Sequence, residues 1–283
     1  AVNWITANRD QPMFLYLAYC IPHTHWQVPE LGEYAEKDWP EERFKVQAAM
    51  VSRMDRDIGR IKRLLKELRI EEDTLLIFNS DNGAHGQGGT REFFDTTGGL
   101  KGKKRLMTEG GVRSPMLAYW PGKVPAGTHS EHISAFWDFL PTMAELAGEP
   151  INGRTDGLSM LPTLIGEYEQ QKEHRYLYWE LYEGRPNCGV RMGKWKGLVQ
   201  DRRKGMEIEL YDLDADEAEE RNVAHQYPEV VDQIRKAMLE AHEPSAFWDK
   251  NNKPLYNAQA ACDLNAVTYV PRLKTVSYTH LTL

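Results

Sequence analysis

The sequence has few cysteines, no excess of positive charge and no long apolar run. Its three cysteines, Cys20, Cys188 and Cys262, lie far apart without a C-x-x-C pair, which excludes a disulfide framework and a cysteine zinc site. A formal net charge of -7 argues against non-specific binding to nucleic acid, which requires a basic surface. No segment approaches the roughly 20 apolar residues of a membrane-spanning helix, and no signal segment is recognisable.

What is present is enough apolar material for a sizeable core. Of the 283 residues, 41% are hydrophobic and 8 are tryptophan. This length is typical of one large domain or two smaller ones. The chain starts at Ala1 without an initiator methionine, and we expect it to be truncated at that end. Residues 276–283 resemble non-native read-through, and the fold prediction leaves them out.

Hydrophobic patterning in the first half predicts a strand, a helix and a second strand. Residues 13–19 (MFLYLAY) form a continuous apolar run, which is typical of a strand covered on both faces of a parallel sheet. Between about residues 40 and 68, apolar side chains recur every three or four positions and predict an amphipathic helix. The next strand, 74–79, would complete a βαβ unit, which is normally right-handed and part of an α/β sheet.

The second half predicts a change of architecture. A third strand at 115–119 is followed by a helix at 136–146. From about residue 174, short strands separated by turn residues indicate an antiparallel meander, with a helix at 228–242. The acidic stretch 212–220 is predicted to be a solvated turn rather than a metal loop. The predicted organisation is an α/β domain at 1–170, an antiparallel α+β subdomain at 171–245, an extension at 246–275 and the non-native tail at 276–283.

Polar residues follow two of the predicted strands. Asp81 and Asn82 come directly after the strand at 74–79, and His23 follows the strand at 13–19. Ligands of open α/β sheets bind outside the carboxyl ends of the strands, so these side chains are predicted to share one rim. Asp81 and Asn82 offer hard oxygen atoms that suit Ca²⁺ or Mg²⁺. Asp-Asn-Gly is also a common turn sequence, so the tripeptide alone leaves both interpretations open.

Histidines and a basic cluster are the remaining candidates. His23 by itself is more typical of a surface histidine than of a catalytic one, and His25, followed by Trp26, indicates packing. The densest basic cluster of this acidic chain could recruit an anionic substrate despite the adverse net charge, although a solvated basic loop would have the same composition. Its members are Lys101, Lys103, Lys104 and Arg105.

Three segments, in this order and spacing, resemble the type I sulfatases, the formylglycine-dependent arylsulfatases of the alkaline-phosphatase-like superfamily. They are AYCIPHTHWQVP (18–29), NSDNGAHGQGG (79–89) and GLKGKKRLMTEGGVRSPMLAYWPG (99–122). The resemblance spans about residues 10–245, and the EGGVRSP block with its upstream lysine is its most specific part. It implies an α/β fold, an incomplete alkaline-phosphatase-like α/β/α sandwich with a smaller C-terminal antiparallel α+β subdomain.

The resemblance assigns roles to five residues. It implies that Asp81 and Asn82 bind an active-site Ca²⁺, with Mg²⁺ as the alternative, beside two further carboxylates. It implies that His23 contacts the sulfate group and that Lys104 binds a sulfate oxygen, so that both are catalytic and substrate-binding residues. His85 fits a sub-group of the family and is expected near the substrate rather than the metal.

The nucleophile of the family is absent from this sequence. Formylglycine forms from the Cys or Ser of a C-x-P-[S/A]-R motif, and no such motif occurs here. Cys20 is followed by His23 and Thr24 where the motif requires a small residue and then arginine, so Cys20 is not the nucleophile. Formylglycine is therefore expected in a segment outside this chain, and the chain alone is expected to be inactive.

The implied function is hydrolysis of a sulfate ester, either of a sulfated glycan or of an aryl sulfate, in a full-length protein that is periplasmic or secreted. One alternative is a phosphodiesterase or phosphonate monoester hydrolase of the same superfamily, which shares the metal edge. Another is a catalytically inactive homologue that binds an anion or a glycan. No nucleic-acid partner and no membrane span are expected, and the sequence sets no oligomeric state.

Overall fold

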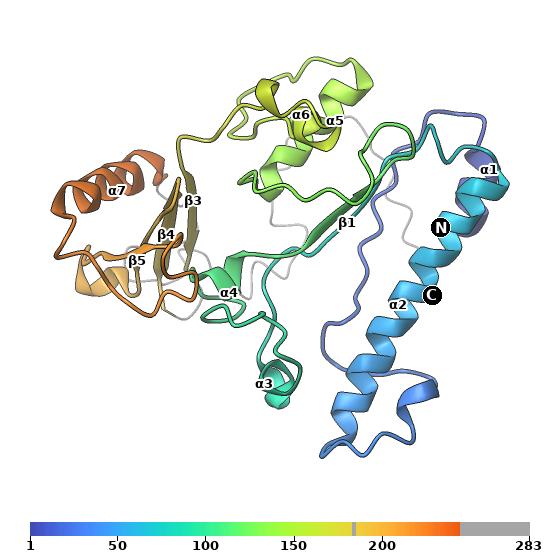
Figure 1. Ribbon diagram of the computed structural model, residues 1–283, viewed down its shortest axis with the longest axis horizontal. Helices are drawn as coiled ribbons and strands as arrows, with labels where there is room; N and C mark the ends of the chain where they lie inside the picture. Colours follow the sequence, from blue (N-terminus) through green and yellow to red (C-terminus); the bar gives the residue numbers. More distant parts are fainter. Residues whose placement is uncertain (183–184, 244–283) are drawn as a thin grey trace, which may run out of the picture.

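The computed structural model describes residues 1–182 and 185–243 (Figure 1). Within these residues the α-helices are α1 (Val2–Asn8), α2 (Glu42–Glu67), α3 (Thr90–Phe94), α4 (Glu109–Val112), α5 (Phe139–Ala147), α6 (Leu161–Leu164) and α7 (Pro228–Ala241). The strands are β1 (Leu76–Asn79), β2 (Met116–Tyr119), β3 (Leu177–Leu181), β4 (Asn187–Met192), β5 (Trp195–Val199) and β6 (Glu209–Asp212). Short 3₁₀ turns are η1 (Gly32–Tyr34), η2 (Gln87–Gly89), η3 (Phe136–Asp138), η4 (Tyr168–Gln170) and η5 (Arg202–Lys204).

The strands predicted at 74–79 and 115–119 are confirmed as β1 and β2, and they form an antiparallel ribbon. Leu76 lies opposite Tyr119, and Asn79 lies opposite Met116. In Figure 1 this ribbon runs across the centre of the molecule, between the C-terminal sheet and the long helix α2. The loop that follows β1 therefore also lies between the C-terminal sheet and α2.

The buried parallel strand predicted at 13–19 is wrong in the part of the chain that the structure describes. These residues form no ladder there, and Phe14 and Tyr16 are 73% and 69% exposed. Met13 and Leu17 pack against the apolar cluster between α1 and α2, while Leu15, between them, is 38% exposed. Since β2 is the neighbour that β1 has among the described residues, no βαβ unit is present in them.

Helix α2 confirms the helix predicted between residues 40 and 68. Met54 and Ile61, two members of the predicted apolar stripe, are buried. Near the start of α2, the ring of Phe44 stacks on that of Phe93 with centroids 4.2 Å apart. Aromatic contacts of this kind hold α3, and with it the loop that follows β1, against α2.

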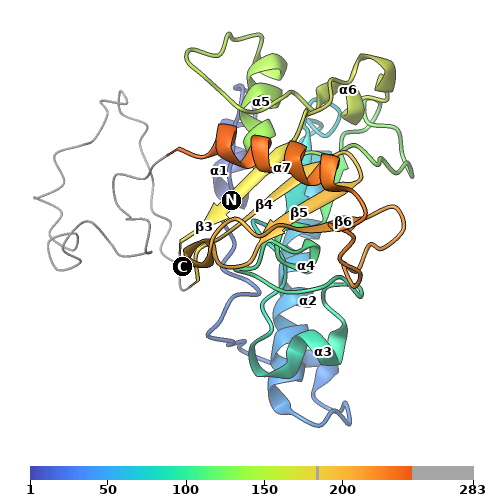
Figure 2. The same cartoon turned by 90° about the vertical axis from the view of Figure 1, so that its left-hand side faces the viewer.

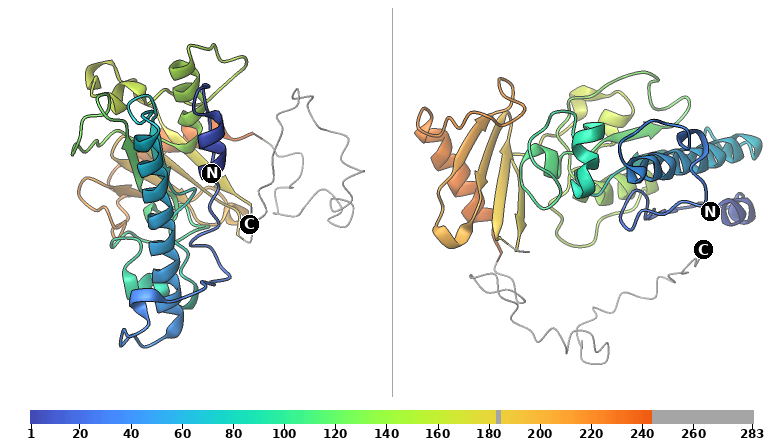
Figure 3. Two further views of the ribbon diagram at one scale, coloured as in Figure 1. Left: turned by 90° about the vertical axis from the view of Figure 1, so that its right-hand side faces the viewer. Right: turned by 90° about the horizontal axis from the view of Figure 1, so that it is seen from below.

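The C-terminal meander is confirmed as a four-stranded antiparallel sheet of order β3-β4-β5-β6. Helix α7 lies across one face of it (Figure 2), over a core that includes Val190, Leu210 and Ile234. Gly197 of β5 allows this close approach, because a Cβ there would lie 2.3 Å from Ile234 Cγ2. The opposite face is turned toward α4, as the right-hand view of Figure 3 shows.

The remaining predictions concern α5 and the C-terminal end. Helix α5, preceded by η3, confirms the helix predicted at 136–146, and it ends at Gly148 with a left-handed φ of 67°. The extension predicted at 246–275 and the tail at 276–283 lie outside the described residues. Among the helices that are described, none has the length and apolar character needed to cross a bilayer.

Candidate functional site

Backbone hydrogen bonds join the loop after β1 to the basic segment before α4. The Gly83 amide donates to Gly111 O at 2.9 Å, and the Lys104 amide donates to Ala84 O at 2.9 Å. The two backbones approach so closely that a Cβ added to Gly83 would lie 2.1 Å from Gly110 O. No residue with a side chain fits there without a shift of the backbone, so glycine is required at this position of the Asp-Asn-Gly tripeptide.

Asp81 and Asn82 lie at the edge of this junction, where Asp81 is exposed. Ser80 Oγ donates to Asn82 O at 3.0 Å, and Ser114 Oγ donates to Ser80 O at 2.8 Å, which ties the turn to the chain before β2. The Asn82 amide nitrogen donates to Gly83 O at 3.0 Å, so its amide oxygen is the atom available to a cation.

These two residues fit Ca²⁺ in the kind of donor atom, since a carboxylate and an amide oxygen are ligands that a hard cation accepts. They do not fill its coordination sphere of about 6–8 oxygens. Among the described residues, no group of three or more His, Cys, Asp or Glu could hold a metal ion. Asp81 and Asn82 can therefore form only part of a calcium site.

His85 lies within electrostatic range of His23, which comes from a distant segment, and of Lys104, which is half-buried. Desolvation lowers the pKa of His85 below its ordinary value, and nearby positive charge lowers it further. The charged neighbours are Lys103, Lys104, Arg105 and His23. His23 Nδ1 donates to Thr24 O at 2.6 Å, because a carbonyl oxygen can only accept, and Nε2 is left as the nitrogen that can face a ligand. The structure thus places His23 and Lys104 within electrostatic range of His85.

The basic cluster divides between two directions. Lys101 Nζ donates to Glu219 O at 2.7 Å and lies 5.1 Å from the centre of the Tyr211 ring, on the side of the C-terminal sheet. The positive charges of Lys103 and Lys104 instead lower the pKa of His85. Lys101 is therefore committed to a protein contact.

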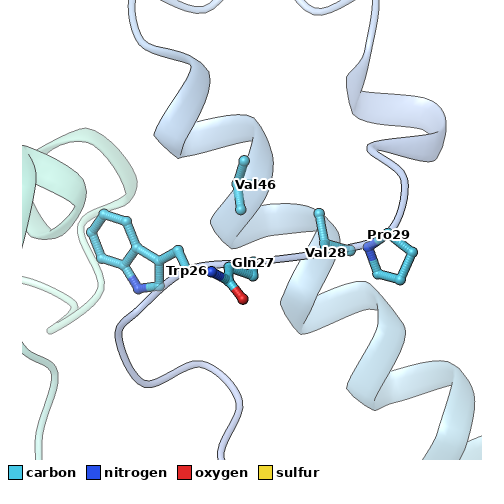
Figure 4. Close-up of a pocket in the computed structure, with 5 residues that line it drawn as sticks. All are labelled: Trp26, Gln27, Val28, Pro29 and Val46. Atoms are coloured by element: carbon cyan, nitrogen blue, oxygen red, sulfur yellow. The ribbon is translucent and has the colours of Figure 1, made fainter.

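A shallow pocket of about 610 Å³ opens next to the segment that carries His23 (Figure 4). Trp26 Nε1 donates to Pro22 O at 3.1 Å, which folds the ring back over its own segment. The packing predicted for His25 is wrong, because this residue is exposed. Among the described residues, no ionisable side chain lines the pocket, so these residues supply it with no acid, base or nucleophile. The lining residues are Trp26, Gln27, Val28, Pro29 and, from α2, Val46.

A buried ionic network, which the sequence patterns did not predict, lies directly behind the basic segment. Lys196 on β5 is 0% exposed, and its Nζ donates to Glu109 Oε1 at 2.6 Å. The Glu109 amide donates to Glu219 Oε2 at 2.7 Å, and Arg191 Nη1 lies 3.6 Å from Glu109 Oε2. Burial raises the pKa of Glu219 to about 7. Breaking one partner of such a buried pair typically costs about 3–5 kcal/mol.

Two residues show where the sequence interpretation failed and which signal could have helped. The prediction that 212–220 is a solvated turn is wrong at Glu219, because this side chain is 0% exposed and accepts from the Glu109 amide. Lys196 shares a strand face with Leu198, which is buried. Side chains alternate along a strand, so a lysine in register with a core leucine is itself the signal for a buried partner.

Comparison with known families covers most of the described chain. Residues 1–149 match the sulfatase family model, and residues 100–244 match the model for the C-terminal part of N-sulphoglucosamine sulphohydrolase. Human arylsulfatase A is 34% identical over 191 residues, 67% of this chain and 36% of the relative. Human steryl-sulfatase is 33% identical over 183 residues, 63% of this chain and 30% of the relative. Canine N-acetylgalactosamine-6-sulfatase is 35% identical over 196 residues, 66% of this chain and 34% of the relative.

The chain spans about a third of the length of these curated relatives. The crystal structure of Ps i-CgsB is 30% identical, with a TM-score of 0.72, over 84% of this chain and 52% of that chain. A Bacteroides thetaiotaomicron sulfatase, described with the metabolism of multiple glycosaminoglycans, is 26% identical with a TM-score of 0.71, over 85% and 52% of the two chains. These likenesses confirm the alkaline-phosphatase-like α/β fold class. The sulfatase model matches more than half of the residues, and the chain belongs to the sulfatase family.

Proposed function

We propose that the full-length protein is a sulfuric ester hydrolase. The observation that carries this proposal is the hydrogen bond that joins Lys104 to the loop of Asp81, Asn82 and His85, together with the electrostatic effect of Lys104 and His23 on His85. Cleavage of a sulfate ester concentrates negative charge on the sulfonyl oxygens and on the leaving oxygen. A dication, an ammonium and an imidazole aimed at those oxygens would stabilise the charge where it develops.

The role proposed for each side chain follows from its contacts. Lys104 is half-buried, so its ammonium would bind a sulfate oxygen with less competition from water. His23 holds its Nδ1 proton on Thr24 O, and Nε2, when protonated, would donate to a second sulfate oxygen. The lowered pKa of His85 keeps its ring neutral at pH 7, which suits a group that accepts a hydrogen bond from the substrate.

The cation proposed at Asp81 and Asn82 is Ca²⁺, with Mg²⁺ as the alternative. When bound, it would draw negative charge from the sulfate oxygens. The nucleophile is proposed to be a formylglycine outside residues 1–283, because these residues contain no C-x-P-[S/A]-R motif. The described residues would accordingly bind and orient the sulfate group.

Sulfated glycans are the substrate class that we propose first. Support comes from Ps i-CgsB, 30% identical with a TM-score of 0.72, whose structure is also known in complex with k-i-k-neocarrahexaose. Support also comes from N-acetylgalactosamine-6-sulfatase among the relatives, while arylsulfatase A keeps an aryl sulfate as the second candidate. A periplasmic or secreted location is proposed with it, because a polymeric glycan would be accessible there.

Catalytic assays with the full-length protein test this proposal. We expect hydrolysis of 4-nitrophenyl sulfate, and we expect Lys104→Ala to lower kcat/KM by about 10²–10³, the loss typical of one preorganised oxyanion contact. Lys101→Ala should cost much less than Lys104→Ala, because the Lys101 ammonium binds Glu219 O and can affect the sulfate group only through the position of the segment. Equal losses at both positions would show that a diffuse basic patch binds the anion.

The same assay decides between this proposal and its alternatives. Faster turnover of 4-nitrophenyl phosphate or of a phosphonate monoester would favour the phosphodiesterase or phosphonate monoester hydrolase. Binding of sulfate without turnover of any ester would favour the inactive anion- or glycan-binding homologue.

A further inference from the structure

Both faces of the C-terminal sheet are covered, and the basic segment covers one of them. In β5, Val199 packs into the core beneath α7, and Trp195 packs against that core from the same face. Lys196 and Leu198 face the other way, where Leu198 packs with Met107. The right-hand view of Figure 3 shows α7 on one side of this sheet and α4 on the other.

The buried network fixes both ends of the segment that contains Lys104. At its end, Glu109 is held through its carboxylate by Lys196 and through its amide by Glu219. At its start, the Lys101 ammonium donates to the backbone of Glu219. Lys104 therefore lies between two points that are both bonded to the C-terminal sheet or to the loop that follows it.

We propose that Lys196, Glu109 and Glu219 form a positioning device that fixes residues 101–109 and thereby sets where the Lys104 ammonium lies. Hydrogen bonds are directional, so this network selects one arrangement of the segment, which a purely apolar contact would not do. A buried ion pair is seldom more stabilising than well-packed apolar residues, so stability alone does not account for it. Only the role of Lys104 in binding sulfate rests on the proposed function.

A pair of variants at Glu219 tests the device. Glu219→Ala removes the acceptor of the Glu109 amide, whereas Glu219→Gln keeps an oxygen acceptor and removes only the charge. Hydrogen exchange, measured by mass spectrometry on the full-length protein, reports residues 80–86 and 101–111, which hold the two bonds between the loops. We expect exchange there to be on the order of tenfold faster in Glu219→Ala, the effect of losing one buried hydrogen bond, and close to the parent rate in Glu219→Gln.

Lys194→Met is the matched control for a second variant, Lys196→Met. Lys194 lies next to β5, but its side chain is 43% exposed and pairs with Asp212 at the surface. We expect faster exchange in residues 101–111 for Lys196→Met and no change for Lys194→Met. Exchange in β4 and β5 is the internal reference. Equal acceleration of these strands and of 101–111 in Glu219→Ala, or no recovery in Glu219→Gln, would overturn the proposal.

Titration with inorganic sulfate separates this inference from the proposed function. We expect the parent, Glu219→Gln and Lys194→Met to bind sulfate alike and Glu219→Ala to bind it more weakly. Equal affinity in all four proteins would overturn the positioning role. A parent that binds no sulfate but shows the expected exchange pattern would contradict the proposed function and still support the positioning of the segment.

Discussion

At the scale of single residues, the imidazole of His85 is where the charges of the site meet. Its pKa is lowered first by desolvation and then by the positive charge of His23 and of the basic segment. A cation near an imidazole opposes protonation, so any change that removes positive charge from this place raises the pKa. His85 therefore reports directly on the position of Lys104 and on the arrival of an anion.

We predict that Lys104→Ala raises the pKa of His85 and that saturating inorganic sulfate raises it in the parent protein. Both changes reduce the positive potential at the ring, and the ¹⁵N-detected NMR titration of His85 measures them. Lys123→Ala is the control, because Lys123 follows Tyr119 at the opposite end of the β1–β2 ribbon. An unchanged titration in Lys104→Ala would mean that the Lys104 ammonium does not face His85.

At the scale of elements, the spacing of apolar residues predicts whether a segment is a helix or a strand better than it predicts which segment packs against it. Helix α2 and the strands β1 and β2 lie where their patterns indicate. Residues 13–19 have an equally apolar pattern, yet they form no ladder among the described residues. A continuous apolar run specifies that side chains avoid water, and it does not specify which backbone will accept their hydrogen bonds.

The contact between α4 and the loop after β6 makes a pH-dependent contribution to stability. Glu219 has its pKa raised by burial to about 7, from an ordinary value of 4.5. The hydrogen bond from the Glu109 amide and the charges of Lys196 and Lys101 oppose this rise in pKa, while the charge of the Glu109 carboxylate adds to it. Between these two pH values the folded state holds a proton that the unfolded state has lost. The contribution is therefore complete below pH 4.5 and is lost as the pH rises through 7.

We predict that the parent loses free energy of unfolding over this interval, relative to Glu219→Gln, by on the order of 3 kcal/mol. The amide of Glu219→Gln does not titrate, so it provides the reference at each pH. Chemical denaturation between pH 4.5 and pH 7 measures the difference. Parallel pH profiles for the two proteins would show that the carboxyl group of Glu219 keeps its ordinary pKa.

At the scale of the whole molecule, the site is assembled from segments that lie far apart in the sequence. His23 comes from the segment after α1, His85 from the loop after β1, and Lys104 from the segment that the C-terminal sheet holds. The described residues bring these groups together without completing a metal site. Calcium binding is therefore a property that we propose only for the full-length protein.

We predict that calcium raises the Tm of the full-length protein and that Asp81→Ala removes this rise. A ligand that binds only the folded state raises the free energy of unfolding, and the increase grows with the logarithm of the ratio of ligand concentration to Kd. Residues 1–283 by themselves should show no such rise, because two donors leave most of the roughly 6–8 calcium ligands unfilled. Differential scanning calorimetry with calcium and with a chelator measures the rise in Tm for each protein. The control is Asp73→Ala, before β1, which should keep the rise in the full-length protein. A calcium-dependent rise that persists in Asp81→Ala would contradict the assignment.

The sequence by itself determined the type of most elements, the order of the sulfatase-like segments and the residues Asp81, Asn82, His23, His85 and Lys104 as candidates. These follow from period, from turn chemistry and from short motifs, all of which are local. Only the tertiary structure decided that the Lys101 ammonium binds Glu219 O and that Lys196 is buried against Glu109, which is 87 residues away. It also decided that Glu219 is buried and accepts a hydrogen bond from the backbone amide of Glu109, 110 residues away. The cause is physical, because burial of a charged side chain is unfavourable unless it pairs with a hydrogen-bonding or oppositely charged group. Which distant residue supplies that group depends on how the helices and strands pack.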